Sequence, residues 1–290
     1  MMNQLLTITI IQTKLHWEDK MSNLQMLEQK INSKKEKTEI VVLPEMFSTG
    51  FSMKPETLAE TMDDDTVKWM KRIAAKKKII LTGSIIIKDS SINGQGVNYY
   101  NRLIWMLPNG QYGTYDKRHR FAFAGEDEQY TAGTKRLIAS VKGWKINLQV
   151  CYDLRFPVWT RQARSLPSPP IGGMESANSQ SPEYDVLIYV ANWPEIRSTA
   201  WKSLLQARAI ENQCYVVGVN RVGKDGNDIN HSGDSMIIEP LGEILYHKKD
   251  EEDIFTITLS KDHLQTVREE FPFWKDADGF KILNDEAPTE

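Results

Sequence analysis

The chain has 290 residues, and its 40% hydrophobic and 26% charged residues are typical of a globular protein rather than a disordered one. Its 36 Lys and Arg against 39 Asp and Glu give a net charge of −3, so it lacks the basic field that binding to nucleic acid or anionic lipid usually requires. Two cysteines cannot form a disulfide framework or a four-thiolate zinc site. Because of this charge balance, we expect neither nucleic acid nor a membrane among its partners.

The opening segment MMNQLLTITIIQTK has no basic stretch before its apolar residues and no small-residue cleavage site, so it does not resemble a signal peptide. The longest apolar runs contain only a handful of residues, whereas a membrane span needs about 20. We therefore expect a cytoplasmic protein.

The N-terminal third alternates between short β-branched runs and amphipathic helical patterns. The run at 40–43 is wholly apolar and is followed by Pro44, which is typical of a strand buried on both faces. In 20–37, apolar side chains recur at helical spacing with charged residues between them. In chain order we predict a strand at 5–12, a helix at 20–37, a strand at 40–43, a helix at 66–78 and a strand at 79–87. This β-α-β-α-β order predicts a layered α/β fold.

The rest of the chain adds β-hairpins to this pattern. Turn residues at 108–110, at Gly143 and at 240–242 separate pairs of strand-like runs. We predict hairpins over 99–115, 137–151 and 235–247, strands at 185–191 and 214–220, and a helix at 198–211. A sheet that combines hairpins with βα units is mixed, and it needs helices on one face and a second sheet or a partner on the other.

Residues 165–181 are rich in Ser, Pro and Gly and show almost no apolar periodicity. Predicted strands flank this stretch closely on both sides. We therefore interpret it as a flexible surface loop inserted into a single domain over 1–290, and not as a linker between domains.

Three residues that could do chemistry stand at the ends of predicted strands. Glu45 follows the run IVVLP, Lys117 follows the first hairpin, and Cys151 ends the strand KINLQVC. Rigid sheets commonly hold reacting groups at such positions. Each residue alone also has a structural interpretation, as a helix N-cap carboxylate, a solvated basic loop and a buried small side chain, respectively. The other cysteine, Cys214, is interpreted as a core residue.

The three residues together favour nucleophilic catalysis. A free thiol is only a few per cent ionised at pH 7, so a catalytic cysteine needs a base or a positive neighbour. The five histidines stand in no evident relation to Cys151. A carboxylate acting as the base and an ammonium stabilising charge can replace the usual Cys–His pair.

The motifs around these residues resemble those of a known family. LPEMF around Glu45, YDKRH around Lys117 and CYDLRFP around Cys151 are similar to the three catalytic motifs of the nitrilase (carbon–nitrogen hydrolase) superfamily. The similarity continues through ANWP, QARAIEN, NRVG and GDS and covers nearly the whole chain. Within the superfamily, the chain most resembles bacterial ω-amidases of the YafV type, which are related to the Nit2-like amidases.

This resemblance implies a role for each matched residue. Glu45 would be the general base, Lys117 the electrostatic stabiliser and Cys151 the nucleophile. The family's additional glutamate maps to Glu126, because its spacing to the Thr-Ala-Gly motif fits better than that of Glu128. No metal or organic cofactor is implied.

The resemblance also implies an architecture and an activity. The fold would be α/β, a four-layer α-β-β-α sandwich of two mixed sheets, and the protein would form a homodimer with residues 261–290 packing at its interface. The activity would be hydrolysis of the terminal amide of a short 2-oxo acid, such as 2-oxoglutaramate, with water.

Residues beside the motifs are candidates for binding the substrate. The backbone N–H of Tyr152 could receive the oxyanion. Arg155 could bind a substrate carboxylate, because its planar guanidinium matches that group, or could pair with Asp153 or another structural carboxylate. Four aromatic residues could line the pocket or belong to the core: Phe47, Phe51, Phe121 and Trp193.

Two alternatives stay open at this stage. The chain could belong to another branch of the superfamily, such as the nitrile hydrolases or N-carbamoyl amidases, since all would share Glu45, Lys117 and Cys151. It could also be a catalytically silent binding protein on the same fold, although the intact set of three residues argues against that.

Overall fold

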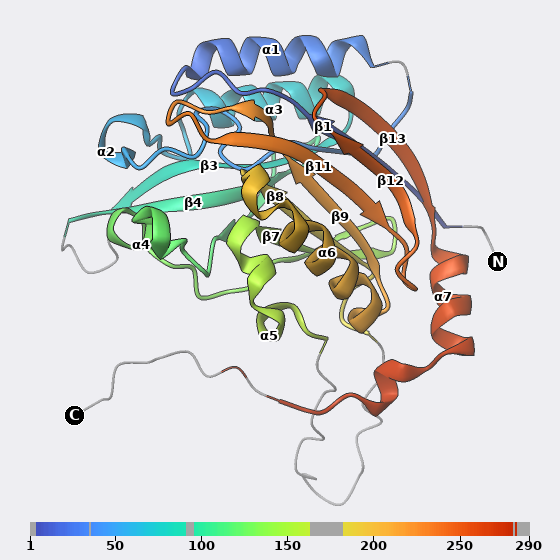
Figure 1. Cartoon of the computed structure of the whole chain (residues 1–290). Helices are drawn as coiled ribbons and strands as arrows, with labels where there is room; N and C mark the ends of the chain where they lie inside the picture. The colour runs from blue at the N-terminus through green and yellow to red at the C-terminus, as the bar shows by residue number, and fades with distance from the viewer. Residues whose placement is uncertain (1–3, 35, 91–95, 163–181, 281, 283–290) are drawn as a thin grey trace, which may run out of the picture.

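Two mixed β-sheets form the framework of the protein (Figure 1). The computed structural model describes residues 4–34, 36–90, 96–162, 182–280 and 282. The predicted loop at 165–181 lies outside the described residues. Among the described residues, no helix is long and apolar enough to cross a membrane.

The first sheet has six strands in the order β13-β1-β2-β3-β4-β5. Strands β1, β2 and β3 are parallel, and β13, β4 and β5 add antiparallel pairs at the two sides. The strands are β1 (Leu5–Gln12), β2 (Ile40–Val42), β3 (Ile80–Ser90), β4 (Val97–Met106), β5 (Tyr112–Asp116) and β13 (Asp253–Ser260).

The second sheet is also mixed, with a parallel centre of β7, β8 and β9. Its order is β10-β11-β9-β8-β7-β6, and β12 pairs with β11. The strands are β6 (Ile138–Val141), β7 (Trp144–Val150), β8 (Val186–Ala191), β9 (Tyr215–Asn220), β10 (Val222–Lys224), β11 (Asn230–Ile238) and β12 (Ile244–Lys249).

The alternation of side chains along the strands explains the layers. In β2, Ile40 and Val42 join the core cluster between the two sheets, whereas Val41 joins the cluster on the other face of its sheet. Helices α1 (Lys20–Ser33) and α3 (Asp65–Lys77) cover that other face, as Figure 1 shows. Because both faces of the parallel strands are buried, a wholly apolar run is required there.

Helix α6 (Ser198–Asn212) covers the outer face of the second sheet. Its Trp201 and Leu205 lie so close to Gly218 in β9 that a Cβ there would stand 2.5 Å from Leu205 Cδ1. The order of layers is therefore helix, sheet, sheet, helix. This confirms the predicted α-β-β-α sandwich.

Short helices complete the chain. They are α2 (Pro55–Leu58), η1 (Ala122–Ala124), α4 (Glu126–Gln129), η2 (Cys151–Arg155), α5 (Pro157–Thr160), η3 (Glu195–Arg197), α7 (Lys261–Glu270) and η4 (Phe273–Asp276). Helix α7 buries Leu264 and Val267 against its own chain, and its Arg268 pairs with Asp185. The dimer interface expected for 261–290 stays a prediction.

Most of the predicted elements are confirmed; the differences are shifted ends, the short helices α2, α4 and α5, and elements in the C-terminal third. The helix predicted over 20–37 ends at Ser33, before the lysine-rich stretch. The strand predicted over 145–151 ends at Val150, because Cys151 turns into the left-handed region with φ of 46°. The sequence patterns did not predict β10, β13 or α7.

Candidate active site

Glu45 lies just beyond the carboxyl end of β2 and is fully buried. Its Oε1 accepts a hydrogen bond from Asn101 Nδ2 at 2.8 Å, and its Oε2 accepts one from the backbone N–H of Asn192 at 2.8 Å. Asn192 Nδ2 also donates to the Glu45 backbone carbonyl at 2.6 Å. The next residue, Met46, has φ of 43° and donates its N–H to Ser84 Oγ at 2.9 Å. The carboxylate therefore has one fixed orientation.

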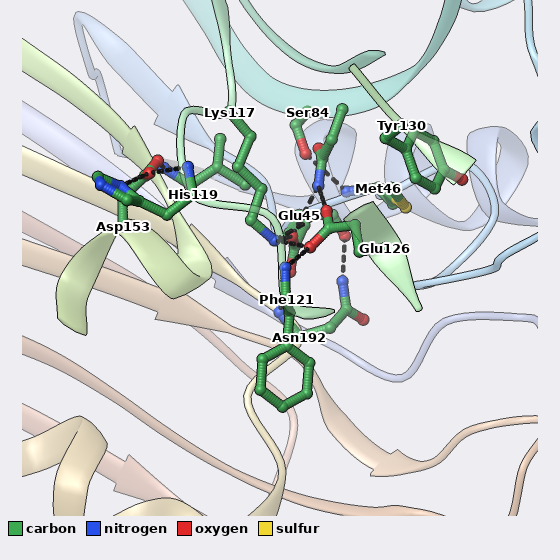
Figure 2. A network of polar contacts seen from close by, with 12 residues as sticks. Glu45, Met46, Ser84, Lys117, His119, Phe121, Glu126, Tyr130, Asp153 and Asn192 are labelled. Atoms are coloured by element: carbon green, nitrogen blue, oxygen red, sulfur yellow. Dashed lines mark hydrogen bonds and ion pairs between the residues drawn. The ribbon is translucent and has the colours of Figure 1, made fainter. Parts of the chain in front are cut away.

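Lys117 follows β5 directly and places its ammonium between two carboxylates, as Figure 2 shows. Its Nζ lies 3.0 Å from Glu45 Oε1 and 2.9 and 2.8 Å from the two carboxylate oxygens of Glu126. The Lys117 carbonyl accepts a hydrogen bond from Gly133 N–H at 2.9 Å. A Cβ on Gly133 would stand 1.9 Å from the Asp116 carbonyl oxygen, so only glycine fits against this segment.

Glu126, at the start of α4, is the glutamate that contacts Lys117 (Figure 2). Its carboxylate accepts hydrogen bonds from Phe121 N–H at 2.6 Å and from Asn101 Nδ2 at 3.3 Å. Glu126 is fully buried, whereas Glu128 is exposed. The geometry thus selects Glu126 of the two glutamates that the sequence offered.

Cys151 begins η2 directly after β7 and lines a cavity together with Lys117. Only 8% of the residue is exposed. Burial raises the pKa of the Cys151 thiol well above its usual value, the charge of Glu45 raises it further, and the Lys117 ammonium opposes both. The resting sulfur is therefore a thiol rather than a thiolate.

The pKa values of the charged neighbours follow from the same arrangement. Burial lowers the pKa of Lys117, but the charges of Glu126 and Glu45 outweigh it, so the pKa rises and the ammonium is retained. Burial and the charge of Glu45 raise the pKa of the Glu126 carboxyl against the opposing effect of Lys117. One ammonium between two carboxylates leaves a net charge of about −1 beside the sulfur.

Asp153 connects the nucleophile turn to the segment after Lys117, a link that the sequence analysis missed. Its Oδ2 accepts from Val150 N–H at 3.0 Å and from the Tyr115 hydroxyl at 2.8 Å. Its Oδ1 accepts from His119 N–H at 2.9 Å and lies 2.8 Å from His119 Nδ1 (Figure 2). The possible signal was its place two residues after the cysteine, just as His119 stands two residues after Lys117.

The cavity above Cys151 has a volume of about 470 Å³. Phe121, Tyr152, Arg155 and Trp193 line it; that they bind the substrate stays a prediction. Arg155 does not pair with Asp153. Its side chain is exposed, and its guanidinium carbon lies 5.3 Å from the centre of the Trp193 ring.

The other residues singled out by the sequence lie either in the pocket or in the core. Phe51 lines the cavity, and Lys117 Nζ lies 5.1 Å from the centre of its ring. Phe47 does not line the cavity, because it is fully buried and packs against Trp69. Cys214 is fully buried in the core between the sheet and α6, as predicted. Arg197 also lines the cavity, although the sequence analysis did not identify it.

Comparisons with known proteins extend over almost the entire chain. Residues 7–168 and 173–269 match the carbon–nitrogen hydrolase family. The chain is 40% identical over 282 residues to the omega-amidase YafV of Escherichia coli strain K12, covering 96% of this chain and 98% of that protein. It is 31% identical over 275 residues to a 2-oxoglutaramate amidase of Bacillus subtilis strain 168, covering 93% and 96% of the two chains.

A solved structure agrees in fold as well as in sequence. XC1258 from Xanthomonas campestris, a CN-hydrolase superfamily protein with an arsenic adduct in its active site, superposes with a TM-score of 0.87 at 38% identity. The match covers 96% of this chain and 99% of that chain. With this fold, these motifs and this family match, the chain belongs to the carbon–nitrogen hydrolases of the nitrilase superfamily and is a hydrolase of C–N bonds.

Proposed function

We propose that the protein is an ω-amidase that hydrolyses the terminal amide of short 2-oxo acid amides, such as 2-oxoglutaramate, to the 2-oxo acid and ammonia. The observation that carries this proposal is the buried ammonium of Lys117, held by Glu45 and Glu126 at the base of the cavity that Cys151 lines. The likeness to proteins named omega-amidase YafV and 2-oxoglutaramate amidase supports this substrate class.

The first step is attack by the sulfur with transfer of its proton to Glu45. A thiolate formed alone would add a second negative charge to a buried cluster that already carries about −1, and this cost is reflected in the raised pKa of Cys151. Transfer to Glu45 avoids the cost, because it moves a proton within the cluster and leaves the net charge unchanged. The sulfur–carbon bond forms as the proton moves, and the carbonyl π electrons pass to the oxygen.

The oxyanion that forms needs positive groups at its position. The Lys117 ammonium and the backbone N–H of Tyr152, the residue after the nucleophile, are the groups we assign to it. One donor of this kind contributes about 10²- to 10³-fold in rate. The left-handed φ of Cys151 supports this assignment, since backbone strain of this kind occurs where a functional side chain must point into a site.

Collapse of this intermediate breaks the C–N bond, and Glu45 gives its proton to the nitrogen so that ammonia leaves. Cys151 then carries a thioester. Water attacks the thioester carbon while Glu45 accepts the water proton, the C–S bond breaks, and the proton returns to sulfur as the acid leaves. Glu126 positions Lys117 throughout, because both of its oxygens contact the ammonium.

The test compares substrates and variants. We expect ammonia release from 2-oxoglutaramate to exceed that from a nitrile or an N-carbamoyl amino acid. A preference for either of those would place the chain in another branch of the superfamily. Cys151→Ala should abolish ammonia release, whereas Cys214→Ala, a change to the buried core cysteine, should lower stability and keep the activity.

Mass spectrometry of the protein during turnover tests the covalent step. An acyl adduct should appear on the peptide that contains Cys151 and should be absent from Cys151→Ala. Full activity of Cys151→Ala would contradict the nucleophile assignment, whatever the substrate preference.

A further inference from the structure

Asn101 is a buried polar residue in β4 that contacts all three charged residues of the candidate active site. Its side-chain Nδ2 donates to Glu45 Oε1 at 2.8 Å and to Glu126 Oε1 at 3.3 Å, and its backbone carbonyl accepts from Lys117 N–H at 3.0 Å. Asparagine is disfavoured within strands, and the next residue on the same face, Leu103, is apolar and fully buried. A polar residue at such a position conflicts with local propensity, and conflicts of this kind concentrate at functional sites.

The Asn101 amide and the Lys117 ammonium contact the same two carboxylate oxygens. Lys117 Nζ lies 3.0 Å from Glu45 Oε1 and 2.9 Å from Glu126 Oε1, which are the two atoms that Asn101 Nδ2 also contacts. The four atoms therefore form a closed ring in which two donors alternate with two acceptors. The ammonium brings a positive charge to this ring, whereas the amide brings two N–H groups and no charge.

The other atom of the Asn101 amide shows that this orientation is specifically required. Asn101 Oδ1 is buried and has no hydrogen-bond partner among the described residues, and an unpaired buried acceptor is unfavourable. The reversed amide would place this oxygen against two carboxylate oxygens, neither of which can donate. Both N–H groups are thus committed to the glutamates, so position 101 requires a neutral side chain with two donors.

The proton transfers of the reaction change how firmly Glu45 is held. Once Glu45 has taken the proton of Cys151 it is neutral, and its electrostatic attraction to Lys117 weakens. The hydrogen bond from Asn101 does not depend on that charge, because the oxygen of a neutral carboxyl still accepts. Asn101 therefore holds Glu45 in the same orientation in both of its protonation states.

We propose that Asn101 is a positioning residue of the reaction. It keeps Glu45 in place while that residue is neutral, so that the same carboxyl can protonate the leaving nitrogen and then activate water. The proposal rests on the amidase function proposed above and adds a residue to its mechanism. Asn101 is not among the described residues that line the cavity, so it acts through Glu45 and not by binding the substrate. Its removal should therefore lower kcat and leave KM nearly unchanged.

Asn101→Leu removes both donors and keeps a side chain of similar size. Its kcat for ammonia release from 2-oxoglutaramate should fall by about 10- to 100-fold, because hydrogen bonds to charged groups are worth factors of this size. Its KM should stay within about threefold of the wild-type value. A raised KM with an unchanged kcat would overturn the proposal.

Asn147→Leu is the matched control. Asn147 is also a fully buried strand asparagine, in β7, and its Nδ2 has no partner among the described residues. It is not among the described residues that line the cavity. The control should lower the urea midpoint of unfolding and keep the wild-type kcat. An equal loss of kcat in Asn101→Leu and Asn147→Leu would show a general effect of disturbing the core, and would overturn the positioning role.

Asn101→Asp keeps the shape of the side chain and gives a readout in pH, including where Asn101→Leu fails to fold. Its new carboxyl stands beside two carboxylates, so it keeps a proton more readily, and when protonated it restores one donor. The ratio of its kcat to that of the wild type should therefore rise as the pH falls from about 8 to about 5.5. The other titratable groups of the cluster are common to both proteins and cancel in the ratio: Glu45, Lys117, Glu126, Tyr130 and Cys151. A ratio that does not change with pH would contradict the proposal.

Alkylation of Cys151 by iodoacetamide separates this proposal from the amidase function itself. The reaction needs transfer of the thiol proton to Glu45 but breaks no amide bond. Mass spectrometry of the peptide that contains Cys151 should show alkylation about 10-fold slower in Asn101→Leu than in the wild type, and unchanged in Asn147→Leu. If alkylation depends on Asn101 but no amide is hydrolysed, the positioning role holds and only the proposed function is wrong. If ammonia release is confirmed but neither kcat nor alkylation depends on Asn101, the positioning role is wrong.

Discussion

The inner end of the cavity and its mouth hold their charged groups in different ways. At the inner end, Glu45, Lys117 and Glu126 are buried, Lys117 forms ion pairs with both glutamates, and the two carboxylates accept hydrogen bonds from the backbone N–H groups of Asn192 and Phe121. At the mouth, Arg155 and Arg197 end single turns of 3₁₀-helix and form no ion pair with the described residues. The charges of the first set are paired within the protein, whereas those of the second are not paired among the described residues.

We expect this difference to separate residues that transfer protons from residues that contact the substrate. A group that transfers a proton must be held in one geometry, because small displacements of reacting groups are costly in rate. A group that binds a substrate charge must keep its hydrogen bonds free for that charge. The rigid ends of parallel strands therefore carry Glu45 and Cys151, whereas the turns that follow carry the arginines.

Lys117→Met should have the largest effect on stability and activity, because it removes the ammonium that pairs with both buried glutamates. It leaves two buried carboxylates without a counter-charge, and removing one partner of a buried pair typically costs about 3–5 kcal/mol of stability. Ammonia release should fall by about 10³-fold. Urea unfolding and an ammonia assay measure the two effects, and Arg155→Met at the mouth should change the free energy of unfolding by less than about 0.5 kcal/mol.

The stability of the Lys117→Met protein should also depend on pH, in a direction that follows from the pKa of Glu126. Lys117 opposes the rise in the pKa of Glu126, so its removal should raise that pKa further. The folded variant then binds a proton that the unfolded chain has released, and its stability falls as the pH rises. The destabilisation should thus be smaller at pH 5.5 than at pH 8. Equal unfolding free energies of variant and wild type at pH 8 would contradict the ion-pair account.

Gly133→Ala should have the next largest effect, through the backbone that carries Lys117. The added Cβ would stand 1.9 Å from the Asp116 carbonyl, so the segment must shift, and overpacking of this kind typically costs about 1–3 kcal/mol. We expect kcat to fall together with stability. Gly125→Ala is the matched control, since its φ is 75° but nothing lies within 4 Å of the added Cβ.

Gly125→Ala should lower the free energy of unfolding by only about 1 kcal/mol, because alanine is strained in the left-handed backbone conformation. Circular dichroism during thermal unfolding and steady-state kinetics on both variants make the comparison. A Gly133→Ala protein with wild-type kcat would show that the position of Lys117 does not depend on this contact.

The sequence pointed to the residues of the inner end and to Arg155 at the mouth but did not point to Arg197, for physical reasons. Glu45 and Cys151 follow strands whose apolar runs are local signals, Lys117 follows a hairpin with a clear turn at 108–110, and the three motifs around these residues are distinctive. Arg197 is an arginine in a polar turn, and nothing near it in the sequence indicates a cavity. Its guanidinium lies over the ring of Phe121, which stands 76 residues earlier in the chain.

Asp153 and the strand β13 also went unpredicted. Asp153 bonds to Tyr115 and His119, which come from another strand end, so its place two residues after the cysteine was the one local signal and did not by itself indicate these partners. Strand β13 pairs with β1, about 250 residues away, but its sequence DIFTITLS alternates apolar and polar residues from Phe255 onward, which is a local strand signal that the sequence analysis did not use. The contacts of Asp153 thus depend on distant segments, whereas β13 also has high local strand propensity.

Phe123→Ala, a change at the mouth of the cavity, should have the smallest effect on stability. Phe123 lines the cavity, but 87% of it is exposed, so truncation should change the free energy of unfolding by less than about 0.5 kcal/mol. Phe51→Ala is its counterpart at the inner end, where the ring lies under the Lys117 ammonium and packs with buried residues, and it should cost about 2 kcal/mol. Urea unfolding of both variants tests the contrast, and a Phe123→Ala cost as large as that of Phe51→Ala would mean that the mouth is held as firmly as the inner end.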